Sequence, residues 1–328
     1  MLPDPIKSGR TPHIGVLINP LSGGNLKGLD SVRSVIDNYP EVMHRDVQNP
    51  REVLDALVDF ARRGVDLLAV NGGDGTVQAV LTSLFHNRPF RNMPLLAILQ
   101  SGTTSMTARD VGFSGSRVRS LQKLFKWAVT GDGEPRLLQR PVLQVQAPGH
   151  QAYYGMFFGA SAIYQGIEYF HRKINTKGLR GELGPGITIL RFLWSAIRQR
   201  SGFIPPIPVS VTVDEKPPQS FDSFVVLVST LERLFLGIHP YWGLEPGPLH
   251  YTAVRAYPRH LLVALPALLR GRGSHVGTSE NGYYSHNAHE IELFLDGGFT
   301  LDGQLYTPES QEKPIVVRYG GMANFIRI

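Results

Sequence analysis

Three glycine-rich loops, each directly after a short apolar run, constrain the fold of this chain more than any other feature. The apolar runs cover residues 13–18, 65–70 and 95–99, and each fits a buried strand. The loops are NPLSGGN (19–25), NGGDGT (71–76) and SGTTS (101–105). Helical patterns follow the loops, and repeated strand–loop–helix units predict a parallel sheet with both faces covered.

The second loop carries the strongest functional signal. Consecutive glycines let the backbone approach an anion, and the helix that follows points its N–H groups back at the loop. Asp74 would repel a phosphate, so it fits either a role in ordering the loop or a contact with phosphate-bound Mg²⁺. A plain strand-to-helix turn has a similar composition, and the local sequence leaves both interpretations open.

The other two loops offer donors of the same kind. Ser22 and Asn25 supply a hydroxyl and an amide, and residues 102–105 supply three hydroxyl groups ahead of a helix. Taken alone, these loops also fit an ordinary connection and a capped helix start. Because parallel strands end at one edge of a sheet, we expect all three loops to lie together and bind a ligand there.

The pattern changes near residues 131–135. Short alternating runs bounded by turn residues follow, which predict an antiparallel sandwich or barrel. They cover residues 141–147, 152–158, 208–213, 221–228, 249–256 and 289–295, with helical segments at 160–173 and 186–200. A length of 328 residues suits two domains, since a domain takes about 150 residues.

Composition narrows the partners and the location. The 33 basic and 27 acidic side chains give a net charge of +6, which suits a nucleotide or an acidic membrane surface. No long basic block occurs, so nucleic acid is not expected. The absence of Cys excludes disulfides and a thiol nucleophile. No apolar run reaches the roughly 20 residues of a membrane helix, and the first ten residues lack a signal-peptide core, so we expect a cytoplasmic location.

Two further features stay ambiguous on local sequence. Asp302, in the turn Leu301-Asp302-Gly303-Gln304, fits a general base for phosphoryl transfer or a plain Asp-Gly turn. The segments 186–200 and 259–272 are apolar and carry arginines. Each fits a helix on a membrane surface or a helix packed on the core.

The loops, in this order and spacing, resemble the diacylglycerol kinase-like lipid kinase family, which includes sphingosine and ceramide kinases and compact bacterial relatives. The resemblance covers about the first 112 residues. It continues more loosely at Phe158–Ala162 and at LDGQ, which resembles a late LDGE element. GGDGT alone is shared with NAD kinases and phosphofructokinases, and the added NPLSGGN loop favours lipid kinases.

The resemblance implies an α/β plus β fold. An NAD-kinase-like α/β domain with a parallel sheet is expected over 1–135, and an antiparallel β-sandwich domain for the lipid substrate over 136–313. Residues 314–328 are expected to return to the first domain. The implied activity is ATP- and Mg²⁺-dependent phosphorylation of a lipid hydroxyl by a peripheral protein at the inner membrane face. The lipid and the oligomeric state stay open.

The resemblance also assigns site residues. Asp302 and Asp74 are expected to be catalytic, with Asp302 as the base, and Asp74 and Glu245 are expected to hold metal. The nucleotide ligands it implies are Asn19, Ser22, Gly72, Gly73, Gly75, Thr76, Gly102, Thr103 and Thr104.

Three positions depart from the family pattern. The family's Gly-Thr-Gly-Asn-Asp loop is Gly-Thr-Thr-Ser-Met at residues 102–106, so Ser105 and Met106 replace the amide and the carboxylate. The Glu of the late LDGE element is Gln304. An Asp-Gly of the second domain is replaced by Glu245-Pro246-Gly247. The alternatives are a non-catalytic nucleotide- or lipid-binding protein and a kinase for a soluble substrate such as NAD.

Overall fold

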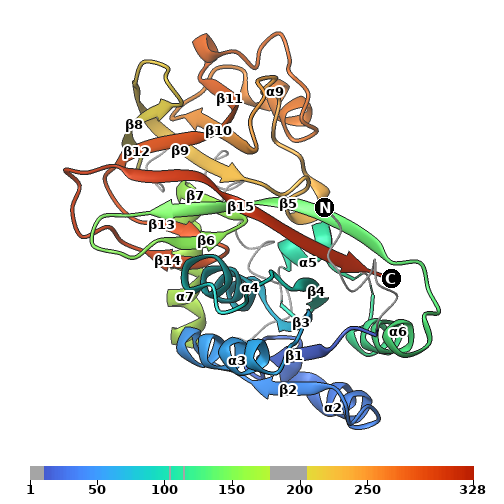
Figure 1. Cartoon of the computed structure of the whole chain (residues 1–328). Coiled ribbons are helices and arrows are strands. Elements are labelled where there is room, and N and C mark those ends of the chain that lie inside the picture. Colours follow the sequence, from blue (N-terminus) through green and yellow to red (C-terminus); the bar gives the residue numbers. More distant parts are fainter. Residues whose placement is uncertain (1–10, 103–104, 114, 178–204) are drawn as a thin grey trace. The chain divides into compact units, whose positions relative to one another are not determined.

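The computed structural model describes residues 11–102, 105–113, 115–177 and 205–328 and divides the chain into two compact units (Figure 1). Unit 1 comprises Met1–Arg140 and Gly321–Ile328, and unit 2 comprises Pro141–Gly320. The divisions fall a few residues beyond those expected at 135 and 313.

Unit 1 is built on a parallel sheet, as the repeated strand–loop–helix pattern predicts. Its strands are β1 (Ile14–Ile18), β2 (Met43–Asp46), β3 (Leu67–Gly72) and β4 (Leu95–Gln100), in the order β2-β1-β3-β4. The end of β15 (Ile315–Arg327) adds beside β4 in the same direction, with Phe325 opposite Leu96. The carboxyl ends of β1, β3 and β4 therefore point to one edge of the sheet.

Helices cover this sheet. They are α2 (Leu29–Asp37), α3 (Pro50–Arg62), α4 (Asp74–Thr82), α5 (Met106–Val111) and α6 (Arg117–Thr130), with a 3₁₀ turn η1 (Asn25–Lys27) and a π-helical turn η2 (Ser83–Asn87). The side chain of Asn49 accepts the N–H of Glu52 at 3.0 Å and so caps α3, which has Pro50 at its first position. Buried residues of strands and helices, among them Leu67, Leu124 and Phe125, form the core.

Helix α4 begins at Asp74, inside the glycine motif. The N–H groups of Thr76 and Val77 donate to the carbonyl of Gly73 at 2.9 and 3.1 Å. Asp74 and Gly75 thus form the first helical turn. The glycine motif is both the end of a strand and the start of a helix.

Unit 2 is antiparallel, in agreement with the alternating runs. Its strands are β5 (Arg136–Gln146), which starts in unit 1, β6 (Tyr153–Gly155), β7 (Phe157–Ser161), β8 (Ile207–Val213), β9 (Gln219–Ser229), β10 (Leu249–Arg255), β11 (Tyr283–Ala288), β12 (Glu290–Leu295), β13 (Phe299–Leu301) and β14 (Gln304–Tyr306). Helices α7 (Ala162–Lys177) and α9 (Leu261–Leu268) and the 3₁₀ turns η3 (Phe235–Gly237) and η4 (Ser279–Asn281) complete it. The expected helix at 186–200 lies outside the described residues.

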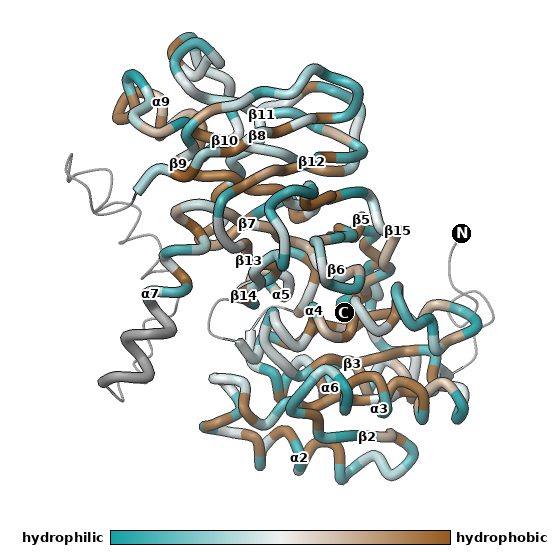
Figure 2. The backbone as a smooth tube through the Cα atoms, turned by 90° about the vertical axis from the view of Figure 1, so that its left-hand side faces the viewer, coloured by the Kyte–Doolittle hydropathy of each residue, from teal (hydrophilic) through white to brown (hydrophobic). Residues whose placement is uncertain are grey.

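Strand β9 organises the core of unit 2. Its first half pairs with β8, and its second half lies between β7 and β10. Strand β8 alternates buried and more exposed residues, as a half-buried strand should. The ring centroids of Phe158 and Phe299 lie 5.2 Å apart within the core. Figure 2 shows that brown, hydrophobic segments alternate with paler ones along the strands of this unit. No helix among the described residues is both long and apolar enough to cross a bilayer.

Candidate active site

The first and second glycine-rich loops are tied together by hydrogen bonds. The Asn19 amide Nδ2 donates to Thr76 Oγ1 at 2.9 Å, and the Gly73 N–H donates to Ser22 Oγ at 3.1 Å. The backbone N–H of Asn19 also donates to the carbonyl of Asn71 at 2.9 Å. Four of the residues expected to hold a nucleotide thus meet at one place.

The third loop lies against the other two. The N–H of Gly24 donates to the carbonyl of Ser101 at 2.8 Å. A Cβ added to Gly102 would come within 2.7 Å of the Gly73 Cα, so only glycine fits at position 102 without moving backbone. Thr103 and Thr104 lie outside the described residues. We call residues 19–25, 71–76 and 101–102 the glycine cradle.

The cradle presents the N-terminus of α4. A Cβ on Gly72 would lie 2.5 Å from the Cβ of Thr76, so position 72 also requires glycine. Among the described residues no side chain caps this helix. The first N–H groups of the nine-residue helix and its positive dipole end therefore remain directed at the cradle, an arrangement that favours phosphate.

Arg117, which no sequence motif marks, lies on the cradle. Its guanidinium donates to Asn25 Oδ1, and the same nitrogens come within 3.1 and 3.3 Å of a Cβ built on Gly24 and Gly28. Burial lowers the pKa of Arg117, and within the described part of the chain no carboxylate pairs with it. An unpaired, partly buried cation next to the glycine loops favours an anionic ligand.

Asn25 connects this cation to the sheet. It is buried, and its Nδ2 donates to the carbonyls of Asn19 at 2.7 Å and Asn71 at 3.2 Å. Ser101 closes the arrangement by donating to Asn71 Oδ1. The last residue of NPLSGGN is thus a structural part of the cradle rather than an exposed donor.

Asp74 orders the cradle through helix α5. Its Oδ2 accepts the N–H of Met106 at 3.0 Å, and its Oδ1 accepts the N–H of Thr107 at 3.1 Å. Burial raises the pKa of Asp74, while these backbone amides favour the ionised form. Both oxygens accept backbone N–H groups, so the geometry supports the ordering role, and a contact with phosphate-bound Mg²⁺ stays a prediction.

Asp302 lies in unit 2, at the turn between β13 and β14. Its side chain is only 2% exposed, and its Oδ2 and Oδ1 accept the N–H groups of Met156 at 3.0 Å and Phe157 at 2.9 Å. Its backbone φ of 48° and the φ of 84° at Gly303 are those of a tight hairpin turn. Asp302 is therefore held rigidly in one orientation by the start of β7.

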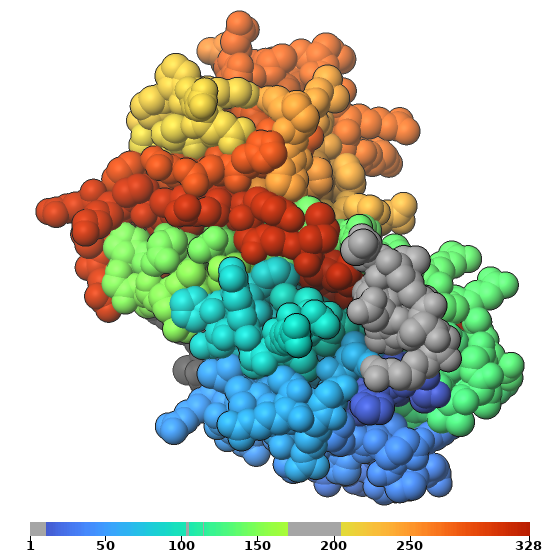
Figure 3. Space-filling model, viewed as in Figure 1, coloured from blue at the N-terminus to red at the C-terminus, as the bar shows by residue number. Residues whose placement is uncertain are grey.

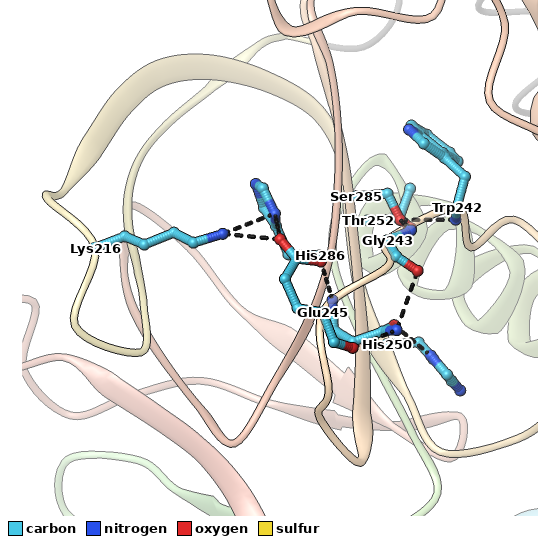
Figure 4. Close-up of polar contacts among 9 residues, drawn as sticks. Lys216, Trp242, Gly243, Glu245, His250, Thr252, Ser285 and His286 are labelled. Atoms are coloured by element: carbon cyan, nitrogen blue, oxygen red, sulfur yellow. Dashed lines mark hydrogen bonds and ion pairs between the residues drawn. The ribbon is translucent and has the colours of Figure 1, made fainter.

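Glu245, expected to hold a metal, lies in an ion-pair cluster of unit 2 (Figure 4). Its Oε1 accepts hydrogen bonds from Lys216 Nζ at 2.8 Å and His286 Nδ1 at 2.6 Å, and its Oε2 accepts the N–H of Asn287 at 3.1 Å. Partial burial acts to raise the pKa of Glu245, but the donors from Lys216 and His286 outweigh it and hold the pKa well below its usual value.

These surroundings give no support to a cation at Glu245, which stays a prediction of the resemblance. The Lys216 ammonium already neutralises the carboxylate and would repel Mg²⁺, which prefers several oxygen ligands. Across the described residues, no group of three His, Cys, Asp or Glu side chains could hold a metal ion. Ion-pair and amide contacts thus occupy the position where the family resemblance implies a metal.

Comparison with known proteins identifies a kinase domain in this part of the chain. A family model described as the diacylglycerol kinase catalytic domain matches residues 13–131, which include the whole cradle and Arg117. No curated protein matches the sequence.

Solved structures extend the likeness beyond that domain. A diacylglycerol kinase from Bacillus anthracis is 18% identical, with a TM-score of 0.58 and 96% of each chain covered. A second structure from that organism, provisionally assigned to the same enzyme, is 20% identical with a TM-score of 0.62, and again 96% of each chain is covered. These identities show a shared fold. Residues 13–131 therefore resemble a diacylglycerol kinase catalytic domain, and the whole chain shares the fold of these solved structures.

Proposed function

We propose that this protein is an ATP-dependent lipid kinase that phosphorylates a hydroxyl group of a membrane lipid of the diacylglycerol, ceramide or sphingoid type. One observation carries the proposal: three glycine-rich loops converge at the edge of a parallel sheet with Arg117, which pairs with no carboxylate among the described residues. That arrangement lies within the residues that match the kinase family model. The diacylglycerol kinase fold of the whole chain supports a lipid acceptor.

The cradle fits a triphosphate by its chemistry. The hydroxyls of Ser22 and Thr76 each accept one hydrogen bond from a neighbouring loop, so each O–H is left to donate to a phosphate oxygen. The N-terminus of α4 and Arg117 add positive charge. In this proposal Mg²⁺ would be held mainly by the nucleotide phosphates, because Lys216 already neutralises Glu245.

The transfer step has simple chemistry. The lipid oxygen forms a bond to the γ-phosphorus, the bond from that phosphorus to the β–γ bridging oxygen breaks, and ADP leaves. We assign the hydroxyl proton to the carboxylate of Asp302. The amides of Met156 and Phe157 each donate to one oxygen of this carboxylate. These amides would fix the orientation of the base.

The test uses labelled ATP and Mg²⁺ with a total lipid extract and, in parallel, with NAD. We expect label in the organic phase only. Label in NAD would replace the lipid acceptor with a soluble one, and ATP binding without any transfer would favour a non-catalytic binding protein. A lipid acceptor also implies that the protein works as a peripheral protein at the inner membrane face.

Removing the charge of Arg117 should weaken nucleotide binding. We expect Arg117→Met to raise the Kd for ATP about tenfold or more and to leave adenosine binding almost unchanged, because charge-assisted hydrogen bonds to phosphate are lost. Calorimetric titration measures both constants. Arg119→Met is the matched control, since Arg119 is exposed two residues along the same helix. Equal ATP affinity in both variants would remove Arg117 from the site.

A further inference from the structure

Helix α9 is apolar on both its faces. Its eight residues are LLVALPAL, with no polar side chain among them. A helix on the surface of a soluble protein normally has a polar outer face. The tube of α9 in Figure 2 carries the brown of hydrophobic residues.

The inner face of α9 explains half of this composition. Ala264 and Leu268 are buried and pack against Tyr283, with Trp242 and Val276 beside them. This contact anchors the helix to unit 2. One face of the segment 259–272 therefore packs on the core. The outer face of the helix takes no part in this contact.

The outer face is open. Leu262 is 71% exposed and Val263 is 63% exposed, and Tyr257, just before the helix, is 78% exposed. Pro266 is exposed as well. Orange atoms of this part of the chain lie on the surface of unit 2 in Figure 3. Several large apolar side chains in one short segment are more than the single exposed residues common on protein surfaces.

Positively charged residues flank this apolar helix in the sequence. Between Glu245 and Glu280 the sequence contains no Asp or Glu. It contains four arginines there, all exposed: Arg255, Arg259, Arg270 and Arg272. Within the residues that the structure describes, none of the four forms an ion pair. Their charges are available to an anionic partner.

We infer that this α9 surface, made of Tyr257, Leu262, Val263 and the four arginines, binds a bilayer that contains anionic lipid. Apolar side chains would enter the boundary of headgroups and acyl chains, and guanidinium groups would pair with lipid phosphates. A second copy of the chain fits less well, because a symmetric contact would place like charges opposite each other. The biological purpose of this membrane contact rests on the proposed lipid kinase activity, whereas the contact itself does not.

Vesicle flotation without nucleotide tests the surface directly. The protein should float with vesicles of phosphatidylcholine and phosphatidylglycerol and float less with phosphatidylcholine alone. We expect Leu262→Asp combined with Val263→Asp to weaken binding at least tenfold, because two apolar side chains leave the bilayer. We expect Arg270→Glu combined with Arg272→Glu to weaken it about 25-fold or more, and only with anionic vesicles.

The controls separate this inference from the kinase proposal. Val129→Asp changes an apolar residue of unit 1 that is 54% exposed and should leave flotation unchanged. Phosphorylation of lipid dispersed in detergent should stay normal in all α9 variants. Floating of both double variants like the unchanged protein would overturn the inference. The inference would also fail if light scattering gave the double variants half the mass of the unchanged protein, because the α9 surface would then be a contact between copies. Binding without kinase activity would contradict only the proposed function.

Discussion

The Gly102→Ala variant will bind ATP at least about a hundredfold more weakly than the unchanged protein. The added methyl carbon would lie 2.7 Å from the Cα of Gly73, and backbone atoms cannot turn aside as a flexible side chain can. One loop must move, and its donors move with it. Two lost hydrogen bonds to a charged phosphate are enough for an effect of this size.

Gly273→Ala is the control for this variant. A Cβ at Gly273 would have one neighbouring atom within 4 Å, at 3.9 Å. Gly273 belongs to unit 2, whereas the cradle residues belong to unit 1. Calorimetric titration with ATP, together with thermal unfolding of both variants, checks the result. Normal ATP affinity for Gly102→Ala would show that the nucleotide does not depend on the close approach of these loops, and the cradle proposal would fail.

The Asp302→Asn variant will lower kcat by about 10²–10⁴ with ATP binding retained, as the loss of a general base requires. Asn tolerates the left-handed backbone that Asp302 adopts, so the turn is preserved. The new NH₂ group would face one of the two backbone N–H donors from residues 156 and 157. We therefore also expect a loss of about 1–3 kcal/mol in the free energy of unfolding.

Stability and catalysis must be measured separately for this residue. Asp296→Asn supplies the comparison, because Asp296 lies in a neighbouring Asp-Gly turn and is exposed. It should change neither kcat nor the unfolding free energy. If Asp302→Asn is less stable but turns over lipid at the normal rate, Asp302 is only an anchor of the β13–β14 hairpin, and another group takes the proton.

The parts of the site that sequence alone predicts are those set by local chemistry and a general rule of parallel sheets. Short apolar runs place β1, β3 and β4, and the rule that such strands end at one edge brings Ser22, Gly73 and Gly102 together. The N-cap at Asn49 is equally local. Its partner lies three residues away, so no tertiary information is needed.

The parts that sequence does not predict depend on contacts between distant residues. Arg117 reaches Asn25 across 92 positions, and Asp74 caps a helix that starts 32 positions later. Nothing near Glu245 in the sequence indicates that Lys216 and His286 surround it. Strand β11 was also missed, because its sequence YYSHNA has little apolar alternation and is fixed by pairing with β10.

Strand β15 has a consequence for the order of folding during synthesis. Its first residues pair with β12 in unit 2, while Phe325 pairs with β4 in unit 1. The parallel sheet that begins at Ile14 therefore lacks its last strand until residues 321–328 leave the ribosome. At about 5–20 residues per second, the delay after Arg140 is on the order of ten seconds or more. During this time the edge of β4 has no neighbouring strand and can pair with other chains.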